Sequence, residues 1–159
     1  FPLLAQVCQA FRGDSRIRFR IVASPDRRDL FAGIPNVEFL CGLRDPELLS
    51  CYQQASLLLQ TLENSTANNV VLEAMACGLP IVAERVGGIC EYVSGENAIL
   101  TEPNDVDTLV RAIRVLAESR QAREQMGQAA RQRAEQLHWK NAAHWTREVY
   151  KQAITGTRR

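Results

Sequence analysis

The sequence predicts an α/β domain, a Rossmann-like parallel sheet flanked by helices. Short apolar runs typical of buried strands alternate along the chain with longer amphipathic segments typical of helices. A polar loop, an apolar helix and a Gly/Pro stop follow one another from residue 64 to residue 80. The length of 159 residues suits one domain with one core.

The amino-terminal part supplies a helix, two strands and a second helix. Residues 2–12 are amphipathic and predict a helix. Residues 18–24 alternate Arg with Phe, Ile and Val, as a strand does, and residues 37–41 predict a strand that ends at Gly42. Residues 46–55 predict the second helix.

The central part repeats this order. Residues 57–60 predict a buried strand that leads into the polar loop, and residues 81–83 predict a strand that leads into Gly87 and Gly88. Residues 98–100 form a weaker last strand. Ligands of parallel sheets bind beyond the carboxyl ends of the strands, so we expect the loops after residues 41, 60 and 83 to form one site.

The carboxy-terminal part is helical and polar. Asn104 or Asp105 is expected to cap one helix, Ser119 opens another, and Gly127 predicts a break or kink. Asp105-Val106-Asp107 superficially matches a metal-binding DxD, but two acids at a helix start indicate capping. Trp139 and Trp145 are expected to anchor the terminal helix to the domain.

The segment NSTANNVVLEAMACGLP, residues 64–80, predicts a ligand site. Its loop is rich in helix-capping side chains, its helix is apolar, and Gly78 and Pro80 end it. The amides and the dipole at the helix start favour a phosphate. Glu73, one turn further along, is expected to point inward and to pair with sugar hydroxyls. The alternative is a solvated or internally hydrogen-bonded glutamate.

Residues 57–91 resemble the donor-site segment of retaining glycosyltransferases with the GT-B fold, the group-1 or family-4 type. The similarity is carried by the run LEAMACGLPIVA and by Gly87-Gly88 followed by Glu91. Weaker similarity covers nearly the whole chain. The resemblance implies that residues 1–154 are the carboxy-terminal, nucleotide-sugar-binding half of a GT-B fold and that residues 155–159 are a frayed tail.

The resemblance also implies roles for individual residues. The glutamate that matches Glu73 binds ribose hydroxyls in such enzymes, and the amides around Asn68, Asn69 and Val70 hold the diphosphate. Within the same loop, Thr66 and Ala67 are counted as donor-binding.

Four further residues are expected to contact the donor from neighbouring loops. Gly42 and Leu43 offer backbone groups and an apolar contact to the nucleobase, while Gly87 and Gly88 allow close approach of the backbone. The alternative for each glycine is an ordinary turn.

The chain departs from the family pattern at two places. A glutamate that contacts the transferred sugar is usual where this chain has Ser65, so Glu63 and Ser65 are the candidate catalytic residues. From the resemblance we expect the given residues to lack the usual first strand and its basic loop, which neutralises the diphosphate, as well as the amino-terminal acceptor domain.

The resemblance implies transfer of a sugar from a nucleoside diphosphate to an acceptor, without a metal or other cofactor. A non-catalytic module that binds nucleotide sugars or phosphosugars is the alternative. A flavodoxin-like signalling domain would need an acidic cluster around Asp26, which the sequence lacks.

Composition limits the partners. The 19 basic and 18 acidic residues nearly cancel, and no nucleic-acid motif occurs. The arginines at positions 12, 16, 18, 20, 27 and 28 are expected to form a solvated face, with a phosphate or anionic membrane as the alternative. The five cysteines follow no metal or disulfide pattern and indicate a reducing compartment. No apolar run is long enough to span a membrane, so we expect a cytoplasmic protein, with contact to the inner face of the membrane at most peripheral.

Overall fold

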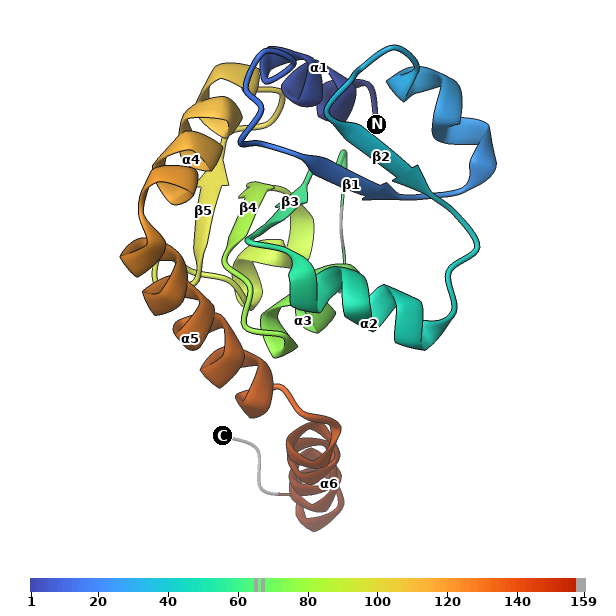
Figure 1. Ribbon diagram of the computed structural model, residues 1–159. Helices are drawn as coiled ribbons and strands as arrows, with labels where there is room; N and C mark the ends of the chain where they lie inside the picture. The colour runs from blue at the N-terminus through green and yellow to red at the C-terminus, as the bar shows by residue number, and fades with distance from the viewer. Residues whose placement is uncertain (65, 67, 157–159) are drawn as a thin grey trace.

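The computed structural model describes residues 1–64, 66 and 68–156, and the alternating strands and helices predicted from the sequence are present (Figure 1). The described strands are β1 (Phe19–Val22), β2 (Val37–Leu40), β3 (Leu58–Gln60), β4 (Ile81–Glu84) and β5 (Ala98–Thr101). The described α-helices are α1 (Pro2–Ala10), α2 (Asp45–Gln54), α3 (Asn69–Ala76), α4 (Val106–Glu118), α5 (Arg120–Gln136) and α6 (Trp139–Thr155). Two 3-10 helices that the sequence did not predict are η1 (Pro25–Phe31) and η2 (Gly87–Glu91).

The strand pairs are parallel, which confirms the predicted class. β1 pairs with β2, β3 pairs with β4, and β4 pairs with β5. The described strands form two hydrogen-bonded groups, β1–β2 and β3–β4–β5. Side-chain packing joins the two groups, since Phe19 and Ile21 of β1 belong to the same apolar cluster as Val82 of β4.

Strand alternation divides the core into two apolar clusters on opposite faces of the β3–β4–β5 group. Val82 points to one face, where α1 and α4 supply Val7, Leu109 and other side chains. Its neighbour Ile81 points to the other face, which Met75 of α3 shares with side chains of α2, η2 and α5. β4 is buried on both faces and is the centre of the molecule.

α3 and α5 approach each other through two glycines. Gly127 is buried inside the helix α5, which is continuous, so the predicted break at this residue was wrong. A Cβ on Gly127 would overlap the carbonyl oxygen of Gly78, which lies just after α3 and has a φ of +76°. The absence of a side chain at Gly127 therefore serves close helix packing.

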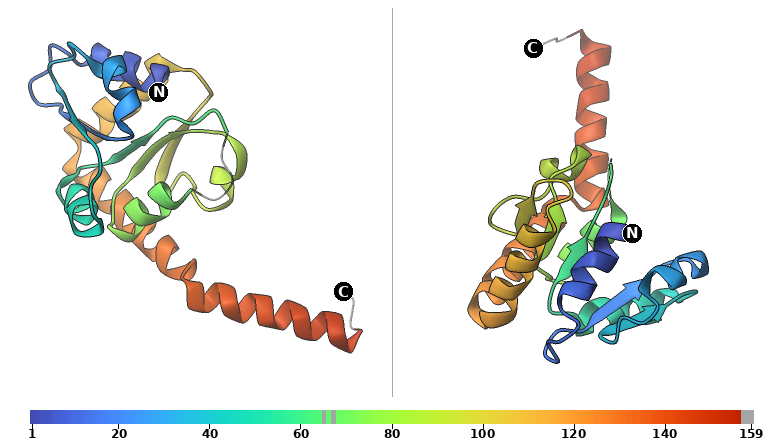
Figure 2. Two further views of the ribbon diagram at one scale, coloured as in Figure 1. Left: turned by 90° about the vertical axis from the view of Figure 1, so that its right-hand side faces the viewer. Right: turned by 90° about the horizontal axis from the view of Figure 1, so that it is seen from above.

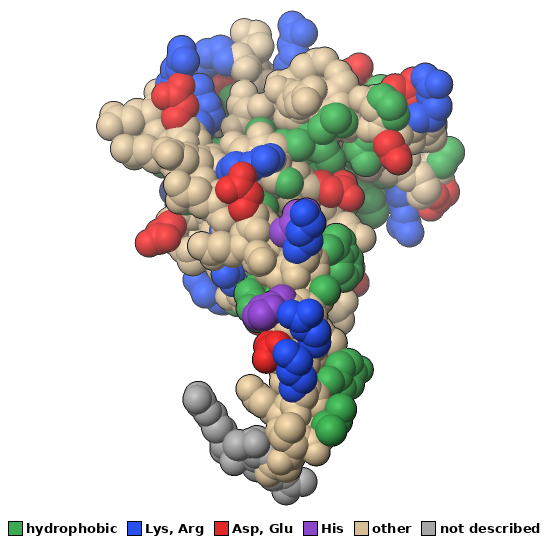
Figure 3. All heavy atoms as spheres, turned by 90° about the horizontal axis from the view of Figure 1, so that it is seen from below, with side chains coloured by type: hydrophobic (Ala, Val, Ile, Leu, Met, Phe, Trp, Pro, Cys, Tyr) green, Lys and Arg blue, Asp and Glu red, His purple; other side chains and the backbone are tan. Residues whose placement is uncertain are grey.

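α6 projects from the body of the domain (Figures 1 and 2). Its tryptophans do not return it to the domain as expected, because Trp139 is 86% exposed and Trp145 is 53% exposed. Figure 3 shows apolar side chains along one side of α6 and Lys, Arg and His along the other. Gly156 closes the helix with a φ of 72°, and residues 157–159 of the predicted frayed tail lie outside the described range.

Within the described part of the chain, no helix is both long enough and apolar enough to cross a bilayer.

Candidate functional site

The candidate site lies at the carboxyl end of the β3–β4–β5 group. The segment between β3 and α3 and the 3-10 helix η2, which Gly87 opens after β4, both begin beyond strands of this group. Parallel pairing places these strand ends at one edge. The predicted donor segment and the Gly87-Gly88 pair therefore come from neighbouring strands of the same group.

Asn68 shapes the start of α3. Its side-chain oxygen accepts a hydrogen bond from the amide of Val71 at 3.3 Å, which is an N-cap. Its own amide donates to the hydroxyl of Tyr92 at 3.1 Å. Among the described residues, the amides of Asn69 and Val70 donate to no acceptor, because the first N–H groups of a helix have no partner within the helix. The site therefore offers unpaired donors to an anion.

Glu73 is exposed, so the predicted inward orientation was wrong. The buried side of α3 is formed by Val71, Ala74 and Met75, and helical periodicity places Glu73 on the opposite side with Asn69 and Val70. These three exposed residues form one open face at the start of the helix. The face is directed away from the core and is accessible to a ligand.

Tyr52 of α2 holds the Glu73 carboxylate. Its hydroxyl donates a hydrogen bond to Oε2 of Glu73 at 2.9 Å, and its ring is buried. Burial, and then the hydrogen bond to Glu73, raise the pKa of Tyr52, so its hydroxyl remains a donor at neutral pH. One oxygen of Glu73 thus has a fixed partner, and the carboxylate keeps further lone pairs for a ligand.

Glu84, the last residue of β4, is a second carboxylate at this edge and is only 3% exposed. Its Oε2 accepts from the amide of Leu62 at 3.0 Å, and its Oε1 accepts from the amide of Asn104 at 2.6 Å. Leu62 belongs to the loop after β3, and Asn104 belongs to the turn after β5. Glu84 therefore connects the three strand ends of this group.

The glycines adopt conformations that explain their presence. Gly87 opens η2 with a φ of 53°, and Gly42 follows β2 with a φ of 66°. Gly42 and Leu43 follow the β1–β2 group, and no hydrogen bond or ion pair among the described residues links them to the donor segment. Their contact with a nucleobase stays a prediction, as does the role of Gly88.

The candidate catalytic residues lie in the loop between β3 and α3. Glu63 is exposed, and no ion pair of the described residues includes it. Thr66 is exposed as well. Ser65 and Ala67 lie outside the described residues, so their predicted roles stay predictions.

Asp105 is a helix cap, as predicted. Its carboxylate accepts from the amide of Thr108 at 2.9 Å and from the Thr108 hydroxyl at 2.6 Å. These hydrogen bonds lower the pKa of Asp105. Among the residues with a described placement, no group of three or more metal-binding side chains occurs.

Several of the amino-terminal arginines have partners on the surface. Arg16 pairs with Asp14 at 2.8 Å, Arg20 pairs with Glu38 at 2.9 Å, and the guanidinium of Arg28 lies 4.8 Å from the ring centre of Phe39. These contacts agree with the solvated face predicted from the sequence.

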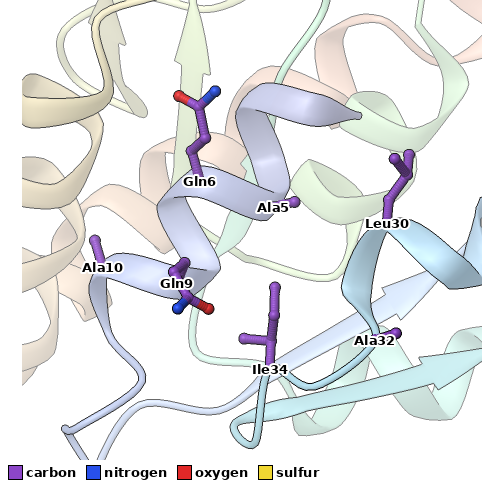
Figure 4. Close-up of a pocket in the computed structure, with 7 residues that line it drawn as sticks. All are labelled: Ala5, Gln6, Gln9, Ala10, Leu30, Ala32 and Ile34. Atoms are coloured by element: carbon purple, nitrogen blue, oxygen red, sulfur yellow. The ribbon is translucent and has the colours of Figure 1, made fainter.

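Two hollows lie apart from Glu73 and the start of α3. One, of about 590 Å³, is formed between α1 and residues 30–34, with Gln6, Gln9 and Ile34 among its lining residues (Figure 4). The other, of about 320 Å³, lies between residues 90–97 and α5. Neither is lined by Glu73 or by the start of α3.

Sequence reasoning missed three residues of the site: Tyr52, Tyr92 and Glu84. Each acts through a hydrogen bond to a residue at least 20 positions away, which one sequence does not reveal. A signal was present for Glu84, because a single carboxylate ends the otherwise apolar strand IVAE. For the two tyrosines the indication in the sequence was weaker, because a tyrosine that is buried usually needs a hydrogen-bond partner for its hydroxyl.

The chain is similar to known glycosyltransferases over most of its length. It is 38% identical to the sulfoquinovosyl transferase SQD2 of Arabidopsis thaliana over 134 residues, which are 81% of this chain and 26% of that protein. It is 31% identical to a D-inositol 3-phosphate glycosyltransferase of Streptomyces bingchenggensis, with 99% of this chain and 38% of that protein covered. The chain thus spans well under half the length of these curated relatives.

Solved structures show the same fold. A sucrose-phosphate synthase of Thermosynechococcus elongatus matches 98% of this chain with a TM-score of 0.77 and 22% identity, and the match covers 42% of that chain. HepE of Anabaena, solved in complex with UDP and glucose, matches 84% of this chain with a TM-score of 0.67 and 26% identity, and the match covers 38% of that chain.

The family model described as "Glycosyl transferases group 1" matches residues 2–119. This match includes the strands, the donor segment and α4. The chain belongs to the group 1 glycosyl transferases.

Proposed function

We propose that this chain is the donor-binding half of a retaining glycosyltransferase, which transfers a sugar from a nucleoside diphosphate to an acceptor. The observation that carries the proposal is the open face of α3, where Asn69, Val70 and Glu73 are exposed beside first-turn amides at the carboxyl edge of the sheet. HepE, which has the same fold, is solved with UDP and glucose, and this favours a uridine nucleotide as the donor.

In the proposed reaction, the start of α3 binds the diphosphate. The amides of Asn69 and Val70 and the positive end of the helix dipole stabilise the charge that grows on the leaving diphosphate. A well-placed donor of this kind contributes about 3 kcal/mol to lowering the barrier. The proposed reaction uses no metal, so activity is expected to persist in a chelator.

Glu73 positions the nucleotide in this proposal. Tyr52 fixes one carboxylate oxygen, and the other accepts hydrogen bonds from ribose hydroxyls. Glu73 does not act as a base. In the proposed step the bond between the sugar and the diphosphate breaks, the acceptor hydroxyl bonds to the same face of the sugar carbon, and its proton passes to the departing phosphate oxygen, so that the configuration is retained.

The partner in this proposal is an amino-terminal acceptor domain that covers the apolar side of α6. Helical periodicity gathers Trp145, Val149, Tyr150 and Ile154 on one side of this helix, and all four are exposed. The match to the sucrose-phosphate synthase covers 98% of this chain, so it includes α6, and more than half of that protein lies outside the match. An exposed apolar helix side next to a second domain is a normal interdomain surface.

We place the enzyme in the cytoplasm, with any membrane contact peripheral. The support is that the cysteines are free thiols, which a reducing compartment maintains.

Calorimetric titration of the chain with UDP, GDP, ADP and their sugar conjugates tests the donor site. We expect one nucleotide to bind, Glu73→Ala to abolish binding, and the control Glu118→Ala at the exposed end of α4 to retain it. Failure of every nucleotide to bind at millimolar concentration would contradict the proposal. Binding without turnover in the presence of the acceptor half would favour the non-catalytic module instead.

Association with the acceptor half, supplied as a separate chain, tests the proposed surface. Trp145→Asp is expected to abolish co-elution of the two chains in gel filtration, whereas Lys140→Asp on the polar side of α6 leaves it largely intact. Equal association of both variants would show that the apolar side of α6 is not the interface.

A further inference from the structure

We propose that Glu84 is a positioning residue for the donor: its buried carboxylate fixes the start of the donor loop, residues 61–68. This inference rests on the proposed function, because the loop matters only if it binds the donor. Glu84 ends the central strand β4, between the ends of β3 and β5. Its side chain is thus placed to reach both neighbouring loops.

The two oxygens of Glu84 serve two different loops. Oε2 accepts from the amide of Leu62, 22 residues earlier, at 3.0 Å, and Oε1 accepts from the amide of Asn104, 20 residues later, at 2.6 Å. Leu62 directly precedes Glu63 in the donor loop. Asn104 has a φ of 61°, an uncommon conformation for a residue with a side chain, and directly precedes the cap of α4.

A carboxylate is the side chain that these two amides require. It is an acceptor at both oxygens, whereas a glutamine amide would present an N–H group to one of the two donors. Glu84 forms no ion pair among the described residues, so the amides and the surrounding dipoles alone balance its buried charge. Two charge-assisted hydrogen bonds from loop amides therefore hold the positions of both loops relative to β4.

The donor loop is consequently held at both ends. Glu84 fixes it at Leu62, and the hydroxyl of Tyr92 fixes it at the amide of Asn68, where α3 begins. The Asn68 end carries the amides proposed to bind the diphosphate. Release of the Leu62 end would widen the range of loop conformations, and donor binding would then have to select the competent ones.

The test combines amide hydrogen exchange with UDP titration for the wild-type chain and for Glu84→Gln. We expect exchange at Leu62 to accelerate and UDP affinity to fall, each by about tenfold, which corresponds to loss of one charge-assisted hydrogen bond. Exchange in the core of β4, at Val82, should stay unchanged, because the fold is retained. If Glu84→Gln does not fold, Glu84→Asp keeps the charge but is too short to reach both amides and is expected to show the same two effects.

Two control variants test whether the effects depend on the position of Glu84 and not only on the loss of a carboxylate or on a change at a buried residue. Glu102→Gln removes an exposed carboxylate near the end of β5, and Thr101→Val changes the buried residue that lies opposite Glu84 in the strand register. Both are expected to leave UDP affinity and Leu62 exchange unchanged.

Each outcome decides one point. Unchanged exchange at Leu62 in the Glu84 variants would overturn the proposed contact, and faster exchange with unchanged UDP affinity would overturn its role in positioning the donor. If the wild-type chain binds none of UDP, GDP and ADP although Leu62 is protected by Glu84, the proposed function fails, the inference falls with it, and the loop contact remains as structure only.

Discussion

Replacement of Gly127 by Ala tests the close approach of α3 and α5. The new Cβ would overlap the carbonyl oxygen of Gly78, lie 3.2 Å from its carbonyl carbon and lie 3.7 Å from Cδ of Pro80. None of these atoms belongs to a flexible side chain. Gly78 cannot move alone, because its positive φ ends α3 and Pro80 directly precedes β4.

The expected loss of stability follows from two opposing effects. Ala is favoured over Gly in a helix interior by about 1 kcal/mol. Overpacking costs about 1–3 kcal/mol, and contact with backbone places this case at or above the upper limit. The net loss is therefore about 2 kcal/mol, which lowers the Tm of a chain of this size by about 4–8 °C.

Thermal and urea unfolding, followed by circular dichroism, measure this loss. Gly95→Ala is the matched control, because a Cβ at that position meets nothing within 4 Å, and it is expected to change stability by less than about 0.5 kcal/mol. If Gly127→Ala is as stable as the wild-type chain or more so, the two helices do not approach as described.

Three further predictions concern a cap, the core and a thiol. Asp105→Ala removes the cap of α4 and should lower the free energy of unfolding by about 1 kcal/mol; an unchanged urea midpoint would contradict the capping role. Leu109→Ala in the core should lower the free energy of unfolding by about 2–5 kcal/mol, whereas Ile154→Ala on α6 should change it by less than about 0.5 kcal/mol. The reverse order would contradict the burial of Leu109 and the exposure of Ile154. Burial raises the pKa of Cys8 from 9.0 to about 12, so the neutral thiol contributes stability that is complete below pH 9 and is lost as the pH rises towards 12. Cys8→Ala should flatten the loss of stability over that pH window, and at neutral pH a thiol reagent should modify the exposed Cys90 but reach Cys8 only after unfolding.

Sequence periodicity was sufficient for the strands and the α-helices. The boundaries predicted for the strands agree with the structure within two residues, because apolar runs such as residues 81–83 have no other stable environment in a chain of this length. The cap at Asp105 was also readable, since capping depends on residues only three positions apart.

The errors concern properties that depend on distant parts of the chain. Gly127 looked like a helix breaker, yet its role is set by Gly78, which is far away in sequence. Trp139 and Trp145 looked like core residues, since an apolar helix side has the same pattern whether it faces its own domain or another surface. The inward orientation of Glu73 failed because its neighbours in sequence are apolar while its neighbours on the helix face are exposed.

α5 contacts both elements of the candidate site, α3 and η2. Besides the glycine contact with α3, its Arg131 donates to the carbonyl of Ala76 at the end of α3, and its Arg133 donates to the carbonyl of Glu91 at the end of η2, at 3.1 Å. Residues 137–138 then join α5 directly to α6. A single helix, α5, therefore contacts the ends of both α3 and η2 and leads directly into α6. The projecting helix is joined through α5 to the elements that carry the proposed donor site, although no residue of α6 belongs to that site.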